Sequence, residues 1–134
     1  MSIKVLPSME HTFTIKLQGT ETGQMFEGTF TYKRPNRRTK SEISKTEARL
    51  NEDLKNLDED TKFIHRLLAA LKHTLIKTPD WWSKADFGYE LYDDNITLAV
   101  YKACSDFEGK WFKEVWEEKE EPKKKEDSKE LKDK

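Results

Sequence analysis

Phe63–Trp82 reads FIHRLLAALKHTLIKTPDWW and is the densest apolar stretch in a chain that is otherwise rich in charge. Its large apolar residues recur at helical spacing, which predicts a helix from about residue 61 to residue 77 with one wide apolar stripe. Pro79 ends this helix, and two tryptophans follow. A helix this apolar must be covered, so we interpret the remaining segments as its cover. The stripe consists of Phe63, Ile64, Leu67, Leu68, Leu71 and Leu75.

The composition predicts one domain with a modest core. The chain has 134 residues, of which 34% are hydrophobic and 38% are charged. The 25 lysines and arginines nearly balance the 26 aspartates and glutamates, which gives a net charge of -1. Because domains that bind nucleic acid are usually strongly basic, this balance argues against nucleic acid as the main partner.

A single cysteine, Cys104, excludes an intramolecular disulfide and a zinc site built on cysteines. We interpret it as a small core residue of a protein in a reducing compartment. No apolar run is long enough to span a bilayer, and the first residues lack the apolar segment of a signal peptide. We therefore expect a cytoplasmic protein without membrane contact.

Strict alternation predicts a β-hairpin over residues 11–34. HTFTIKLQ and FEGTFTYK each place apolar residues on one face and mainly threonines on the other, and a glycine-containing turn joins them. An isolated hairpin is marginally stable, so it lies on the helices or pairs with a strand of another chain along its edge. Residues 1–9 are predicted to form an arm that adds a strand or contacts a neighbour.

The segment KRPNRRTK, residues 33–40, is predicted to be a basic loop. It is either a solvated connector or a contact for phosphate or an acidic partner through Arg34, Arg37 and Arg38. A helix then starts at a capping box, with Thr39 as N-cap and Glu42 three residues later. Its apolar stripe is narrow, which fits a helix packed on one side only or a seam between subunits. That stripe consists of Ile43, Leu50, Leu54 and Leu57.

The last third of the chain predicts a structured connection, a helix and a tail. Asp93 or Asp94 caps the final helix, and Gly109 kinks it or separates two helices. Residues 119–134 are almost wholly charged and are predicted to be a disordered tail. The fold class is therefore α+β: a single domain over residues 10–118, in which the hairpin packs on three or four helices within residues 39–118.

The sequence contains no recognisable catalytic or metal-binding constellation. His65 and His73 are eight residues apart, whereas metal sites on one helix use spacings of three or four. We therefore predict a non-enzyme without metal or cofactor. The tryptophans close the core or, as the alternative, serve as partner anchors, because tryptophan is enriched at binding hot spots. They are Trp81, Trp82, Trp111 and Trp116.

Over residues 13–112, the order of features resembles small tail assembly chaperones of long-tailed bacteriophages. A strand rich in Phe and Gly runs into Arg–Pro, and a proline–tryptophan turn precedes an acidic cap and a final helix. The matching positions are Phe26, Gly28, Phe30, Arg34, Pro35, Pro79, Trp81, Trp82, Leu91, Asp93, Asp94 and Tyr101.

The resemblance implies a self-associating, mostly helical protein that coats the tape-measure protein before the tail-tube protein polymerises around it. It also implies a short form and a frameshift-extended form. The lysines at 123–125 fit an A-rich slippery site or, alternatively, an ordinary solvating tail. Two other functions stay open: a structural virion subunit of the tail or head–tail connector, and a small phage adaptor that binds nucleic acid or a host protein.

Overall fold

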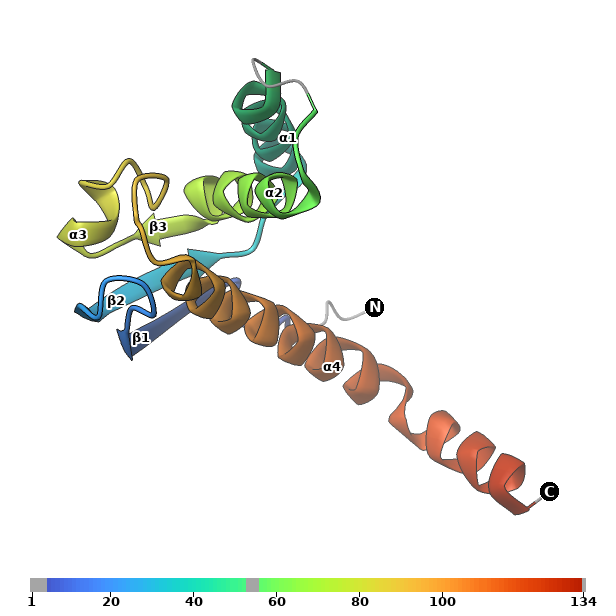
Figure 1. The fold of residues 1–134 in the computed structure, drawn as a ribbon. Helices are drawn as coiled ribbons and strands as arrows, with labels where there is room; N and C mark the ends of the chain where they lie inside the picture. The colour runs from blue at the N-terminus through green and yellow to red at the C-terminus, as the bar shows by residue number, and fades with distance from the viewer. Residues whose placement is uncertain (1–4, 53–55, 134) are drawn as a thin grey trace.

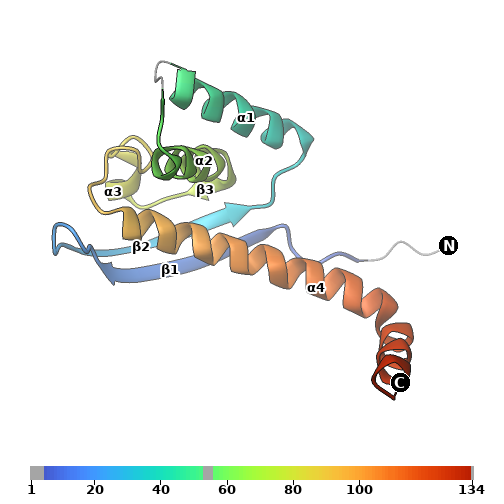
Figure 2. The same ribbon diagram turned by 45° about the vertical axis from the view of Figure 1, so that its right-hand side comes forward.

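The chain folds into a three-stranded antiparallel sheet with helices packed on one of its faces (Figures 1 and 2). The structure, a computed structural model, describes residues 5–52 and 56–133, and side chains only as far as residue 117. The predicted α+β class, with an N-terminal hairpin packed on helices, is confirmed. In chain order the elements are β1 (Glu10–Gln18), β2 (Met25–Lys33), α1 (Arg37–Glu52), α2 (Glu59–Thr74), β3 (Leu75–Lys77), α3 (Asp80–Ser83) and α4 (Asp94–Asp133).

The predicted hairpin is present as β1 and β2, which pair along their full length from Glu10 opposite Lys33 to Gln18 opposite Met25. The threonine-rich face is exposed apart from Thr31, which is buried, and two cross-strand pairs on it are hydrogen bonded at 2.9 Å. These pairs are Thr12 with Thr31 and Thr14 with Thr29. The opposite face carries the aromatic residues into the core, as alternation requires.

The predicted end of the central helix at residue 77 is wrong. Helix α2 ends at Thr74, and Leu75–Lys77 form β3, which extends the sheet by pairing with β2. Two causes act together. Pro79 disfavours helical backbone just before it, and the β-branched Thr74, Ile76 and Thr78 favour extended structure. Leu75 remains buried, as predicted, but on the sheet.

The predicted start of the helix that follows the hairpin, α1, is also wrong, by one short turn. Helix α1 begins at Arg37, because the Asn36 side chain caps it: Asn36 Oδ1 accepts from the Thr39 amide at 2.9 Å and from the Thr39 hydroxyl at 3.0 Å. Asparagine is as strong an N-cap as threonine, so the upstream residue takes the role. Arg37 and Arg38 therefore lie in the first helical turn instead of in a loop.

Helix α4 runs without interruption through Gly109, so the predicted separation into two helices does not occur. It lies across the sheet and extends beyond the rest of the molecule (Figure 1). Its backbone is helical to Asp133, consistent with the high helix propensity of lysine and glutamate. The side chains of residues 118–134 lie outside the described part, so the predicted disordered tail from residue 119 stays a prediction.

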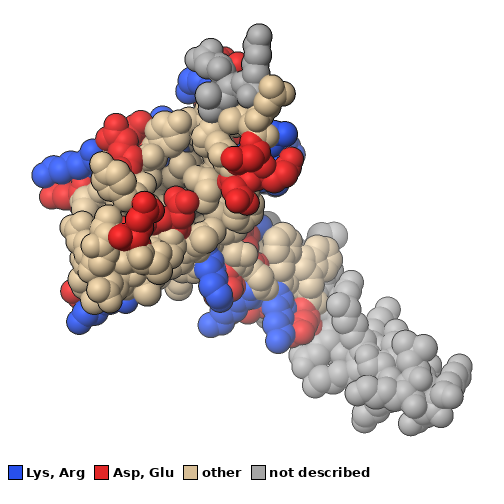
Figure 3. Space-filling view, in the orientation of Figure 1, with Lys and Arg blue, Asp and Glu red and all other residues tan. Residues whose placement is uncertain are grey.

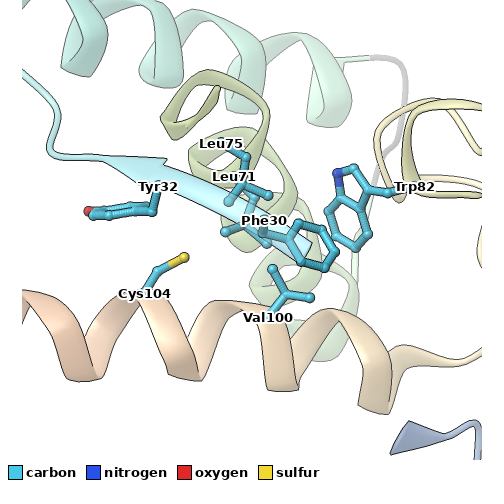
Figure 4. Close-up of a cluster of buried hydrophobic side chains, with 7 residues drawn as sticks. All are labelled: Phe30, Tyr32, Leu71, Leu75, Trp82, Val100 and Cys104. Atoms are coloured by element: carbon cyan, nitrogen blue, oxygen red, sulfur yellow. The ribbon is translucent and has the colours of Figure 1, made fainter. Parts of the chain in front are cut away.

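The core forms where β2, α2, α3 and α4 meet. One aromatic residue from α3 and two from β2 pack against aliphatic residues of α2, β3 and α4 (Figure 4). Cys104 is part of it, which agrees with its interpretation as a small core residue. Burial and then Glu108 raise the pKa of its thiol to about 12, so the thiol is unreactive at neutral pH. The buried cluster is Phe30, Tyr32, Leu71, Leu75, Trp82, Val100 and Cys104.

Replacing Gly28 with alanine is expected to destabilise the fold by about 1–3 kcal/mol through overpacking. A Cβ there would lie 2.6 Å from Pro79 Cγ and 3.1 Å from Trp81 Nε1. Gly109→Ala is the matched control, because no atom lies within 4 Å of its added Cβ. That variant should gain about 1 kcal/mol from helix propensity. Urea unfolding measures both, and a Gly28→Ala protein as stable as the parent would contradict this packing.

Candidate functional site

A groove of about 370 Å³ lies between the first half of α1, the end of α2, the end of β2 and the middle of α4. Its volume falls within the range of pockets that bind small ligands or a few side chains. Four of the residues named in the sequence analysis line this groove: Arg34, Pro35, Ile43 and Tyr101. The apolar lining comes from Ile43, Ala70, Leu71, Tyr101 and Phe112, and the charged residues are Arg34, Lys40 and Glu108.

Glu108 connects β2 to α4 at the base of this groove. Arg34 Nε donates to Glu108 Oε1 at 2.7 Å, and the Tyr32 hydroxyl donates to Glu108 Oε2. Both carboxylate oxygens therefore have a partner. Burial, together with the hydrogen bond and charge of Glu108, raises the pKa of Tyr32 above its ordinary value. The phenol consequently stays protonated and remains a donor to Glu108.

Arg34 is fixed on its other side by aromatic rings. Its guanidinium carbon lies 3.7 Å from the centre of the Trp111 ring and 5.0 Å from that of Phe112. Trp111 is buried, and its Nε1 donates to the Pro7 carbonyl oxygen at 3.4 Å, which holds the arm on α4. Arg34 is thus neutralised and stacked, and it is poorly placed to bind a phosphate. Arg37 and Arg38 are exposed instead.

One side of α4 carries large apolar side chains into solvent beside the groove. Leu98, Tyr101 and Phe112 are 41%, 37% and 48% exposed, and their spacing places them along a single stripe of the helix. Tyr101 and Phe112 line the groove itself. Exposed apolar side chains beside a groove mark interaction sites more often than single exposed residues do.

The residues of the predicted apolar seam are partly covered by other parts of the same chain. Ile43 and Leu50 lie on α1, whereas Leu57 lies in the connection before α2, and all three are half-buried. Leu54 lies outside the described residues. Helix α1 packs on α2, as a helix packed on one side does, and the alternative of a seam between subunits stays a prediction. Of the described seam residues, Ile43 lines the groove.

Two histidines hold α1 on α2, a role that the sequence analysis did not assign to them. Thr46 Oγ1 lies 2.6 Å from His73 Nε2, and Asn51 Oδ1 lies 2.6 Å from His65 Nδ1. His65 is buried and His73 half-buried. His65 and His73 are eight residues apart on α2, whereas their partners Asn51 and Thr46 are five apart on α1. The pairing depends on how the two helices lie against each other, which no sequence pattern reports.

Acidification is expected to weaken the contact of α1 with α2 at His73. Burial lowers the pKa of His73 below its ordinary 6.5. The charges of Lys72 and Arg49 lower this pKa further, whereas the charge of Glu42 raises it. The contribution of neutral His73 is therefore complete above pH 6.5 and is lost as the pH falls through the lowered pKa. The free energy of unfolding should be higher for the parent than for His73→Gln at pH 7.5. This difference should disappear as the pH is lowered to 5. Parallel pH profiles would contradict this.

The tryptophans divide into core and partly exposed residues. Trp82 is fully buried, with its ring edge-on to Phe30 at 5.5 Å, and Trp111 is 7% exposed. The interpretation of these two as exposed partner anchors is corrected, because their surfaces are used within the fold. Trp81 is half-buried and donates from Nε1 to the Glu27 carbonyl oxygen at 2.9 Å, whereas Trp116 is 46% exposed.

Asp93 has a role that the sequence analysis missed. Helix α4 begins at Asp94, and the buried Asp93 carboxylate serves the hairpin turn instead of its own helix. It accepts from the amides of Glu21 at 2.7 Å and Thr22 at 2.9 Å, and from the Thr22 hydroxyl at 2.6 Å. Asn95 also bonds this region, through Thr20. A contact between residues 70 positions apart leaves no local signal.

Within the residues whose side chains are described, 5–52 and 56–117, no three histidine, cysteine or acidic side chains gather as metal ligands. In the same ranges, no helix combines the length and the apolar character that a membrane crossing requires. Comparison of the chain with protein-family models, curated proteins and solved structures finds no match. The resemblance to tail assembly chaperones therefore stays a prediction.

Proposed function

We propose that this chain is a non-enzymatic, protein-binding assembly factor, and specifically a phage tail assembly chaperone that binds the tape-measure protein. The single observation that carries the proposal is the groove between α1 and α4, whose apolar wall is partly exposed through Tyr101 and Phe112. Apolar grooves between helices recognise the apolar face of an amphipathic helix. A tape-measure protein offers such faces repeatedly before the tail-tube protein encloses it.

The charge distribution supports the same proposal. Basic and acidic side chains lie close together on the helices, including the described part of α4 (Figure 3). A surface of interspersed charges keeps a complex dispersed while the apolar groove is occupied. Glu108 and Arg34 compensate each other, so Lys40 supplies the remaining charge of the groove, and the other lining residues are mainly apolar. This favours an apolar peptide over a phosphate group.

Two alternatives are each favoured by one observation. The open edge of β1 suits a structural virion subunit that assembles through its strands. The exposed Arg37 and Arg38 in the first turn of α1 suit an adaptor for nucleic acid or an acidic host protein. The structural subunit would be present in purified virions, whereas a chaperone leaves. The adaptor would bind DNA in a salt-sensitive way that Arg37→Ala with Arg38→Ala abolishes.

Co-expression with the tape-measure protein of the same phage tests the proposal. We expect the tape-measure protein to move from the pellet to the supernatant and to copurify with this chain in the cytoplasmic fraction. A chain with Phe112→Asp should fail to do so, because a carboxylate would have to be buried against the apolar helix. A tape-measure protein that stays insoluble with the parent chain would contradict the proposal.

A further inference from the structure

Among the described residues, strand β1 lies at the edge of the sheet and pairs only with β2 (Figure 2). The Arg34 amide donates to the Met9 carbonyl and the Gly19 amide donates to the Gln24 carbonyl, both at 2.8 Å. Bonds between antiparallel strands alternate along the strand, so the odd-numbered residues of β1 exchange bonds with β2. The even-numbered residues therefore direct their amides and carbonyls away from β2, to the open side.

Local side chains occupy only the two ends of this edge. The Ser8 hydroxyl bonds the backbone of Glu10 at 3.1 Å, and Asn95 Nδ2 donates to the Gln18 carbonyl at 3.0 Å. Among the described residues, none hydrogen bonds the open-side backbone of Thr12, Thr14 or Lys16. A row of unpaired amides and carbonyls in the middle of a nine-residue strand is a template for another strand.

The apolar face of β1 is also incompletely covered. Phe13 and Ile15 are half-buried, whereas Phe26 and Phe30 on the neighbouring β2 are buried. The difference follows from position, because β2 has neighbours on both sides and β1 has one. A further strand beside β1 would cover the remaining surface of its apolar row.

We propose that β1 pairs antiparallel with β1 of a second copy of this chain, about a two-fold axis at Phe13. In this register Glu10 lies opposite Lys16 of the second copy, twice, and Thr12 lies opposite Thr14, twice. Both pairs join even-numbered residues, whose backbone groups face the open side. At Glu10 the second strand takes the place of the Ser8 hydroxyl, which bonds that backbone in the single chain. The three-stranded sheets of the two copies then form one continuous six-stranded sheet.

The charges of the hairpin fit this register across the whole sheet. Within one copy Glu10 already faces Lys33, and Lys16 faces Glu27. Extended into the second copy, each outer row reads Lys33, Glu10, Lys16, Glu27, so that the sign alternates at every step. Lysine on an edge strand normally repels a partner strand, but here a glutamate of the second copy meets it. Registers that align Lys16 with Lys16, or Glu10 with Glu10, place like charges opposite each other.

The charges on the surface beside this edge would not repel a second copy. A groove of about 450 Å³ runs between the arm, His11 and one flank of α4. The charges on that flank are Asp106, Lys110 and Glu114, which alternate in sign at intervals of four residues. A two-fold related α4 running in the opposite direction therefore meets charges of both signs. The inference is independent of the proposed function, because it uses none of the residues that line the groove between α1 and α4.

Charge reversal tests the register with the full chain. We expect the parent to sediment as a dimer at micromolar concentration in analytical ultracentrifugation. Glu10→Lys and Lys16→Glu each place like charges opposite each other twice, and each should raise the dimer dissociation constant at least about tenfold. An equimolar mixture of the two variants restores opposite charges at both positions and should dimerise as tightly as the parent. Lys77→Glu, on the opposite edge strand, is the control and should leave the dimer unchanged.

Hydrogen exchange locates the contact. The amides of Thr12 and Thr14 should exchange at least about tenfold more slowly in the dimeric parent than in the Lys16→Glu monomer. A monomeric parent, single variants that dimerise as tightly as the parent, or a mixture that stays monomeric would overturn the proposal. So would protection of these amides only on addition of a foreign peptide, because the occupant of the edge would then be another protein.

Discussion

Replacing Trp82 with alanine is expected to lower the free energy of unfolding by about 3–5 kcal/mol. Trp82 is fully buried, and its ring packs edge-on against Phe30 and close to Gly88, where an added Cβ would lie 2.6 Å from the indole. Figure 4 shows the ring at the end of the core cluster, beside Phe30. Because a domain of this size is typically stable by 5–15 kcal/mol, the variant would lose a large part of its stability.

Urea unfolding followed by circular dichroism measures this loss. Trp82→Phe keeps an aromatic ring in the site and should lose clearly less than the alanine variant. Tyr92→Ala removes a ring that is 75% exposed and should change the stability by less than about 0.5 kcal/mol. If Trp82→Ala were as mild as Tyr92→Ala, the tryptophan would not be the closure of the core that we describe.

Replacing Asp93 with alanine is expected to lower the melting temperature by more than about 5 °C, because two amides and a hydroxyl of the hairpin turn lose their acceptor at once. Thermal unfolding at pH 7 measures the change. Asp94→Ala is the matched control, since its side chain is exposed in the first turn of α4. Equal shifts for the two variants would show that the carboxylate of Asp93 does not hold the turn.

The same carboxylate predicts a pH dependence. The Thr22 hydroxyl, and then the amides of Thr22 and Glu21, hold the pKa of Asp93 below its ordinary 3.8, although burial acts in the opposite direction. Its contribution to stability is therefore complete above about pH 4 and is lost as the pH falls through the lowered pKa. The parent should lose stability in this window, relative to Asp93→Ala, and a constant difference down to pH 2 would contradict the assignment.

The parts of the fold that depend on local periodicity could be predicted from the sequence. Alternation identified both hairpin strands, and helical spacing identified the core stripe around Leu67 and Leu71. The three residues of β3 were assigned to the preceding helix, because their apolar pattern alone fits both structures and only the pairing with β2 decides between them. The cap of α1 was displaced because Asn36 and Thr39 are both competent caps.

The candidate site was predictable only in fragments. Ile43, Arg34 and Trp111 were singled out, but their pattern gave no reason to place them together. The fold joins them because Glu108 of α4 bonds both Tyr32 and Arg34, a contact across more than 70 residues. The exposed Tyr101 and Phe112 were missed as groove residues for a related reason, since a single helix pattern does not report which of its sides stays uncovered.

Binding of one apolar tape-measure helix to the groove tests the central claim most directly. Isothermal titration of a peptide from an apolar repeat of that protein should give a dissociation constant that Phe112→Ser raises at least about tenfold. The variant removes an aromatic side chain that the bound helix would cover. Tyr92→Ser, an exposed aromatic residue outside the groove lining, should leave the constant unchanged. Equal affinity of the parent and the Phe112→Ser variant would contradict the account.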